Sequence, residues 1–322
     1  MSAPAATPPV VARYPALARL PRASLLAAPT PVAQSDAAPT LWIKRDDLSA
    51  EPLGGNKPRA LEWLLGGVRP GDTVLTVGAW GSTHALATAV HGARLGARVE
   101  VIRWPQEMHP VAAAVKARIE REAARVTDVG SPVAALLRTL TPRLGRRVRW
   151  VPPGGSSPLG ALGAVNAALE LVAQVDAGLL PLPARVVVPL GTGGTSAGLA
   201  LGFAVAGAPV EVIAVRVVPR VVANAWRLHR LAGRTAALLS RAAGAPVPRV
   251  APGMLRVEHG WFGGAYGRAL PAGEAAGDRY RSAHPGGMLE PTYGAKAFAC
   301  ALARCDGRPT LFWVTFDARW LA

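Results

Sequence analysis

The sequence predicts an α/β fold, in which parallel β-sheets are covered by helices on both faces. Short β-branched runs alternate with longer segments whose apolar residues recur at helical spacing, and this alternation continues along most of the chain. The predicted strands are apolar along their whole length, as is typical of parallel strands buried on both sides. With 322 residues, half of them apolar, the chain can bury a large hydrophobic core.

The expected strands and helices follow one another in regular order. Runs bounded by glycines or polar residues predict strands over residues 41–44, 73–77, 99–102, 148–151, 186–188 and 212–215. The intervening patterns predict helices over residues 58–68, 81–96, 111–124, 161–173, from 195 onward and 221–239. Strand, helix and parallel strand in this order form right-handed crossovers, which place helices on both faces of a sheet.

The charge of the chain is a property of its composition. The formal net charge is +16, which is typical of proteins that bind nucleic acids or acidic membrane surfaces. The arginines are scattered singly, however, and few aromatic residues lie among them. We therefore attribute the charge to a bias toward alanine, arginine and proline and predict no specific nucleic-acid partner.

Cysteines and apolar segments indicate a protein of a reducing compartment. Cys300 and Cys305 are too few for a disulfide framework, and no histidine spacing is typical of a metal site. Prolines interrupt the apolar runs before residue 40, so no signal peptide is expected. The most apolar stretch, residues 197–210, is short for a bilayer. The expectation is a cytoplasmic protein with no membrane partner and no metal.

The segment Gly54-Gly55-Asn56-Lys57 ends a polar loop and leads into a predicted helix. Only four of the 36 basic residues are lysines, so a lysine in a glycine-rich turn is unusual in this chain. Pro58 suits the first helical turn, and the helix dipole together with burial would lower the pKa of Lys57. A neutral amine can act as a nucleophile. On these residues alone, a surface lysine beside a turn is the simpler interpretation.

A second segment, residues 186–199, joins a buried strand to a helix through the loop Gly191-Thr192-Gly193-Gly194-Thr195. Its backbone N–H groups and the helix N-terminus would point at one spot, which predicts an anion site. Glycines would let the backbone approach phosphate oxygens. The loop lacks the lysine of a Walker motif. A tight turn between strand and helix explains it equally well.

Two further segments carry polar side chains at predicted helix starts. Ser82 and Thr83 follow a strand and would cap the next helix, whose open N-terminus would also hold a substrate carboxylate. Tyr293 precedes a late helix; taken alone, it indicates only a packed amphipathic side chain.

These segments occur in the same order in the pyridoxal-phosphate enzymes of fold type II. The chain therefore resembles those enzymes, which have the tryptophan synthase β-like fold. The resemblance is greatest to the branch of 1-aminocyclopropane-1-carboxylate (ACC) deaminase and D-cysteine desulfhydrase, and it covers nearly the whole chain. Each piece is weak alone, but the combination is specific. The matching positions are residues 29–32, 43–48, 54–57, 61–62, Ser82, His84, 153–163, 191–199, 264–267 and 290–293.

The resemblance implies a cofactor and roles for named residues. Lys57 would form a Schiff base with pyridoxal 5′-phosphate, which acts as the electron sink. Ser82 would lie at the substrate carboxylate, and Tyr293 and Tyr266 would face the substrate as candidate proton carriers. The cofactor would also contact Thr83, Gly191, Thr192, Gly193, Gly194, Thr195 and Thr315.

The same resemblance implies two three-layer parallel-sheet domains with the cofactor in the cleft between them. The large domain would comprise residues 1–59 and 166–322, and the small inserted domain residues 60–165. A homodimer is implied, as is a lyase or hydrolase that deaminates or β-eliminates a small amino acid of the D-cysteine or ACC type. The alternative is a non-catalytic or repurposed binder of the same cofactor.

Three positions depart from the family pattern, all of them near the cofactor ring. Thr83 replaces an asparagine that touches the ring hydroxyl, and Gly294 replaces a glutamate or threonine at the pyridine nitrogen. The late motif His-Thr-Gly-Gly is replaced by residues 314–317. A weaker electron sink would favour D-cysteine or β-chloro-D-alanine over ACC as substrate. The substitutes considered for the missing nitrogen partner are Thr292, Thr315 and Asp317.

Overall fold

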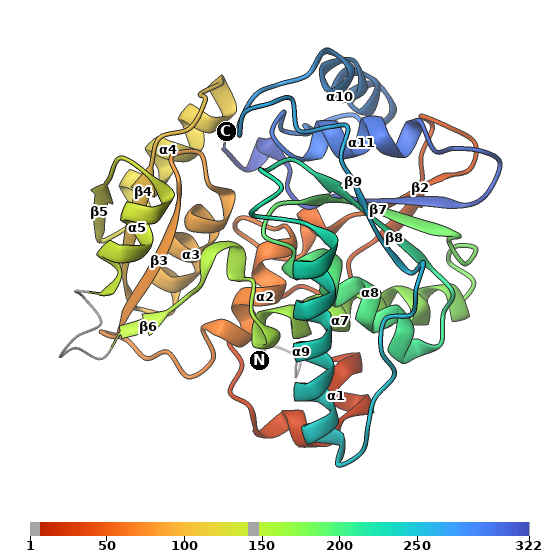
Figure 1. The fold of residues 1–322 in the computed structure, drawn as a ribbon, viewed down its shortest axis with the longest axis horizontal. Helices are drawn as coiled ribbons and strands as arrows, with labels where there is room; N and C mark the ends of the chain where they lie inside the picture. The colour runs from red at the N-terminus through yellow and green to blue at the C-terminus, as the bar shows by residue number, and fades with distance from the viewer. Residues whose placement is uncertain (1–6, 141–147, 322) are drawn as a thin grey trace.

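The computed structural model describes residues 7–140 and 148–321, which form two sheets with their helices (Figure 1). Within these residues, the larger sheet has six strands in the order β1-β2-β10-β7-β8-β9, and the smaller has four in the order β5-β4-β3-β6. Neighbouring strands are parallel except for the β1–β2 pair. The predicted α/β fold with parallel sheets is therefore confirmed.

The larger sheet has helices on both faces. Its strands are β1 (Val32–Gln34), β2 (Leu41–Lys44), β7 (Arg185–Leu190), β8 (Glu211–Arg216), β9 (Leu255–Glu258) and β10 (Thr310–Trp313). Its helices are α7 (Pro158–Asp176), α8 (Gly194–Ala206), α9 (Ala225–Ala243), α10 (Pro271–Ala283) and α11 (Gly294–Leu302). Because side chains alternate along a strand, Val187 and Phe312 pack with α10 and α11, whereas Val186 and Leu311 pack with α7, α8 and α9.

The smaller sheet and the larger sheet lie on opposite sides of helix α2 (Asn56–Leu64) (Figure 1). Val74 and Val99 pack with α2, α3 and α4, whereas Val77 and Ile102 pack with Ala135 of α5. Every strand of this sheet falls within the predicted small domain, whose boundaries stay a prediction. The remaining elements are β3 (Thr73–Ala79), β4 (Arg98–Trp104), β5 (Arg125–Asp128), β6 (Val148–Trp150), α3 (Thr83–Arg94), α4 (Pro110–Glu122), α5 (Pro132–Arg138) and α1 (Pro9–Arg13).

Helix α7 is long and apolar enough, by length and composition, to cross a membrane. Of its most apolar window, 72% is buried inside the protein, where the helix packs against α2 and α8. Its apolar character thus serves the core between the larger sheet and its helices. The stretch of residues 197–210 is similarly part of this core, through α8 and the residues that follow it.

Candidate active site

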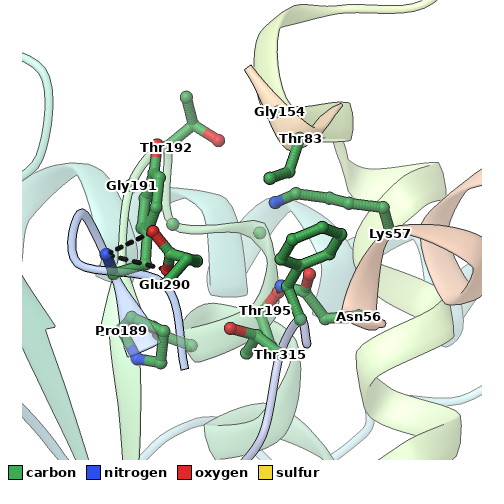
Figure 2. Close-up of a pocket in the computed structure, with 15 residues that line it drawn as sticks. Asn56, Lys57, Thr83, Gly154, Pro189, Gly191, Thr192, Thr195, Glu290 and Thr315 are labelled. Carbon is green, nitrogen blue, oxygen red and sulfur yellow. Dashed lines mark hydrogen bonds between the residues drawn. The ribbon is translucent and has the colours of Figure 1, made fainter. Parts of the chain in front are cut away.

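One cavity brings together residues from distant parts of the chain (Figure 2). It lies where the N-termini of α2 and α8 meet the segment after β10. Its lining residues are Asn56, Lys57, Thr83, Gly154, Pro189, Gly191, Thr192, Gly193, Gly194, Thr195, Ser196, Glu290, Tyr293, Thr315 and Phe316.

The backbone before Lys57 is shaped by a glycine that no other residue can replace without strain. Gly55 has φ of 135°, and a Cβ on it would lie 2.5 Å from the carbonyl oxygen of Thr315. The backbone N–H of Asn56 donates to that oxygen at 3.0 Å. Helix α2 begins at Asn56, two residues before the predicted start, and Lys57 extends from it across the cavity (Figure 2).

The amine of Lys57 has a lowered proton affinity. Burial lowers the pKa of Lys57 from 10.5 to about 8, and no charged group in the described residues contributes to the shift. His84, which lies nearby, is neutral, because burial and the charge of Lys57 lower its pKa to about 3. Lys57 therefore has a much larger neutral fraction near pH 8 than an exposed lysine, as its predicted role requires.

A buried ion network anchors helix α2 just beyond Lys57. The guanidinium of Arg59 donates to Asp46 at 2.6 Å and to Glu170 of α7 at 3.0 Å, and Lys44 of β2 donates to Glu170 at 2.6 Å. Although desolvation opposes ionisation, Arg59 and Lys44 hold the pKa of Glu170 at about 2. The position of Lys57 is thus fixed against both β2 and α7.

The loop after β7 ends in an unpaired helix N-terminus. Within the described residues, the N–H groups of Thr195 and Ser196 have no partner, and neither does the buried hydroxyl of Ser196. The N–H of Gly194 donates to Ser156 Oγ at 3.0 Å, and this oxygen shares a second hydrogen bond with the Thr192 hydroxyl at 2.6 Å. Buried donors at the positive end of a helix dipole are matched to an anion.

The glycines of this loop keep the anion position open. A Cβ on Gly191 would lie 3.1 Å from the Tyr293 ring, and one on Gly194 would lie 2.9 Å from Ser156 Oγ. Gly193 caps α8 with φ of 95°, a conformation that side chains disfavour. The five predicted residues of this loop all line the cavity with Lys57, so the residues present fit a phosphate-bearing group.

Two tyrosine hydroxyls form a partly buried pair beside the cavity. The hydroxyls of Tyr266 and Tyr293 lie 2.6 Å apart, and the rings meet edge to face. Burial raises the pKa of Tyr266 to about 12 and that of Tyr293 well above its usual value. Tyr293 lines the cavity, whereas Tyr266 reaches it through this hydrogen bond. Both phenols are protonated at neutral pH, so the pair can hold and pass a proton.

Of the two residues predicted to reach the site at the start of α3, only one lines the cavity. Thr83 lines the cavity, as expected. Ser82 does not line it; its hydroxyl accepts from the N–H of Ala85 at 3.2 Å and caps the helix. Its role at a substrate carboxylate stays a prediction.

Of the three substitutes considered for the missing nitrogen partner, only Thr315 lines the cavity. The hydroxyl of Thr292 is hydrogen-bonded to His109 at 2.8 Å, and Asp317 accepts from the N–H groups of Met288 and Arg319. Thr292 and Asp317 are thereby engaged elsewhere, because each has its contacts outside the cavity.

Sequence reasoning missed several residues of the site. Glu290 lines the cavity, as do Asn56, Ser196 and Phe316. Asn56 and Glu290 lie inside segments singled out from the sequence, but neither was assigned a role. One local feature could have drawn attention to Glu290: it directly precedes a proline and lies four residues before the start of a helix.

Comparison with known proteins agrees with this geometry. Residues 23–310 match the family described as pyridoxal-phosphate dependent enzyme. The chain belongs to this family. Its fold is the tryptophan synthase β-like fold: a crystal structure titled as that of an ACC deaminase homologue superimposes with a TM-score of 0.78 at 26% identity, covering 97% of this chain and 95% of that one.

Two curated relatives match over most of their length. Nocardicin C-9′ epimerase of Nocardia uniformis subsp. tsuyamanensis is 36% identical and is covered to 94%, with 93% of this chain aligned. D-cysteine desulfhydrase of Salmonella paratyphi A is 33% identical, with 88% of each chain aligned. The protein is therefore a pyridoxal-phosphate-dependent enzyme that is similar to lyases of the deaminase and desulfhydrase group, and the hydrolase class expected beside the lyase class is not supported in detail. The non-catalytic alternative is not favoured.

Proposed function

We propose that this enzyme carries its cofactor on Lys57 and deaminates or β-eliminates a small amino acid of the D-cysteine or ACC type. One observation carries the proposal: the Lys57 amine and the unpaired N–H groups of Thr195 and Ser196 share a single cavity. A small molecule that carries an aldehyde and a phosphate could react with the Lys57 amine through the aldehyde and accept hydrogen bonds from these N–H groups through the phosphate.

Each lining group has a task in this proposal. When bound, the cofactor withdraws electrons from the substrate α-carbon. The N–H groups at the start of α8 and the Ser196 hydroxyl would hold its phosphate, and Thr83 and Thr315, which line the same cavity, would contact it. The Lys57 amine would take the α-proton, and the Tyr293 phenol, hydrogen-bonded to Tyr266, would deliver a proton to the leaving group.

Substrate choice follows from the ring environment. β-Elimination from a substrate with a good leaving group requires less electron withdrawal by the cofactor than opening of the ACC ring. We expect turnover of D-cysteine or β-chloro-D-alanine and little turnover of ACC. The test is a screen of D- and L-amino acids for cofactor absorbance changes, with ammonia and keto-acid release measured for each.

Two tyrosine variants, one of them a control, make this test more specific. Tyr293→Phe should lower kcat by about a hundredfold, in the range typical of general acid–base groups, without weakening cofactor binding. Tyr280→Phe is the control, because the Tyr280 hydroxyl is buried and has no partner within the described residues. Equal losses in both variants would remove Tyr293 from the reaction. If amino acids change the cofactor absorbance but none of them yields a product, the result would instead favour a protein that binds the cofactor without catalysing a reaction.

Epimerisation is the second candidate, and the relative named as an epimerase favours it. Inversion at an α-carbon requires one group that removes a proton and another that returns it. Lys57 and Tyr293 reach the cavity from different segments and meet that requirement. Incorporation of solvent deuterium with inverted configuration, without ammonia release, would identify this reaction.

We further propose a cytoplasmic homodimer that acts on a small amino acid and has no specific nucleic-acid or membrane partner. The two cysteines are unpaired thiols, which supports a reducing compartment. Sedimentation analysis of the purified protein tests the dimer, and a mass of 33.3 kDa in solution would contradict it.

A further inference from the structure

The carboxylate of Glu290 lies in the wall of the cavity that faces Lys57 (Figure 2). Three backbone N–H groups hold it in place: those of Thr292 at 2.8 Å, Tyr293 at 2.9 Å and Gly294 at 2.6 Å. It is also the one acidic residue among the described residues that line the cavity. The carboxylate therefore has a fixed orientation at the start of α11.

Within the described residues, no cation pairs directly with this carboxylate. Glu290 is 3% exposed and forms no ion pair within the described residues. Burial raises its pKa to about 7 against the effect of the three N–H groups, and the Lys296 ammonium, which donates to the Phe262 carbonyl, has the weakest influence. A buried carboxylate without a cation is costly, so a proton-bearing partner in the cavity would stabilise it.

Gly294 lies beside this carboxylate. A Cβ at position 294 would lie 3.3 Å from Leu289 Cδ2 and 3.6 Å from Glu290 Oε1. Any longer side chain there would begin beside the Glu290 carboxylate. Position 294 thus adjoins an acidic group supplied from four residues earlier in the chain.

The position of the nitrogen in the pyridoxal ring limits which residues of the cavity can pair with it. In a pyridoxal ring, the nitrogen lies opposite the carbon that bears the aldehyde, so a ring attached at Lys57 directs its nitrogen away from that amine. Other polar groups of the cavity are already paired: Asn56 with Thr195, and Tyr293 with Tyr266. Thr315 is the competing partner, but a neutral hydroxyl does not favour a protonated nitrogen.

We propose that the Glu290 carboxylate pairs with the ring nitrogen of the cofactor and holds it protonated. The proposal rests on the proposed attachment at Lys57. It assigns to Glu290 the electronic role for which Gly294 has no side chain, because a protonated nitrogen strengthens the electron sink.

The test compares two forms of the cofactor. Apoprotein is titrated with pyridoxal phosphate and with its 1-deaza analogue, in which CH replaces the ring nitrogen, for the native protein, Glu290→Gln and Thr315→Val. Loss of a charged hydrogen bond should weaken binding of pyridoxal phosphate to Glu290→Gln by about tenfold to a hundredfold. The same substitution should leave binding of the analogue unchanged or improve it, whereas Thr315→Val should weaken both ligands alike.

Equal weakening of both ligands in Glu290→Gln would overturn the proposal and leave Glu290 as a cap of α11. If that variant does not fold, ¹⁵N NMR of the native protein with ¹⁵N-labelled cofactor decides: a protonated ring nitrogen supports the proposal, and an unprotonated one overturns it. Borohydride reduction of the same samples, followed by peptide mapping, shows which lysine is modified. Reduction at another lysine would contradict the proposed function rather than the role of Glu290.

Discussion

The side-chain amide of Asn56 donates to the hydroxyl of Thr195 at 2.7 Å, joining residues that are 139 positions apart in the chain. Asn56 directly precedes Lys57 at the start of α2, and Thr195 lies in the first turn of α8. The hydrogen bond therefore fixes the distance between the amine and the anion-binding helix end. A single small molecule can bind both only if this distance is held.

Removal of this link should weaken cofactor binding. In Asn56→Ala we expect the dissociation constant for pyridoxal phosphate to rise about fivefold, since a neutral hydrogen bond contributes about 1 kcal/mol. Asn224→Ala is the control, because Asn224 caps the exposed start of α9. Titration of both apoproteins gives the comparison, and an unchanged constant in Asn56→Ala would show that the link has no such role.

The glycine loop is tested by a charge placed within it. Gly193→Asp should abolish cofactor binding, because its Cβ would lie 3.0 Å from Leu228 Cδ1, and a carboxylate forced among apolar side chains would distort the loop that offers its N–H groups to the phosphate. Gly207→Asp at the other end of α8 has similar strain, with φ of 72° against 95°, but lies outside the cavity. Strain should cost each variant about 1–2 kcal/mol of unfolding free energy. Normal cofactor affinity in Gly193→Asp would show that the loop is only a turn.

The buried network should dominate the stability of α2. Arg59→Met leaves Asp46 without its partner and Glu170 with Lys44 alone, so we expect a loss of about 3–5 kcal/mol in unfolding free energy. Arg308→Met removes an exposed pair with Asp306 and should change stability little. Denaturant titration measures both, and a small effect of Arg59→Met would mean that the network tolerates an uncompensated charge.

Much of the fold was predictable because its central strands are apolar on both sides. The strand predicted at 41–44 coincides with β2, and those at 186–188 and 212–215 lie within β7 and β8. The strands β1, β5 and β9 were missed, and all three lie at sheet edges, where polar residues interrupt the apolar run. The central strand β10 (Thr310–Trp313) was missed as well.

The site was predictable where backbone chemistry determines it. Lys57 beside glycines and residues 191–195 between a strand and a helix have local signatures, and both line the cavity. Glu290 could not be recognised in this way, because its place in the cavity wall depends on the hydrogen bonds that it accepts at the start of α11. The tyrosine pair brings together residues 27 positions apart whose contact no local pattern records.

The reactivity of Lys57 should depend on pH in a defined direction. Since burial lowers its pKa to about 8, the neutral fraction rises through pH 8 and is nearly complete by pH 9. Competitive acetylation of the apoprotein, with peptide mapping, should show Lys57 labelling that reaches its plateau there. Lys116, which is paired with Glu120 on the surface of α4, gives the reference in the same digests. Labelling of Lys57 that still rises steeply above pH 10 would contradict the shift.

The attachment of the cofactor at Lys57 is the central claim, and borohydride reduction tests it most directly. The native protein, loaded with pyridoxal phosphate and reduced, should yield one modified peptide that contains Lys57, and Lys57→Ala should yield none and lose the visible absorbance band. A reduced adduct on Lys44, Lys116 or Lys296 in the native protein, or an adduct that persists in Lys57→Ala, would contradict the account.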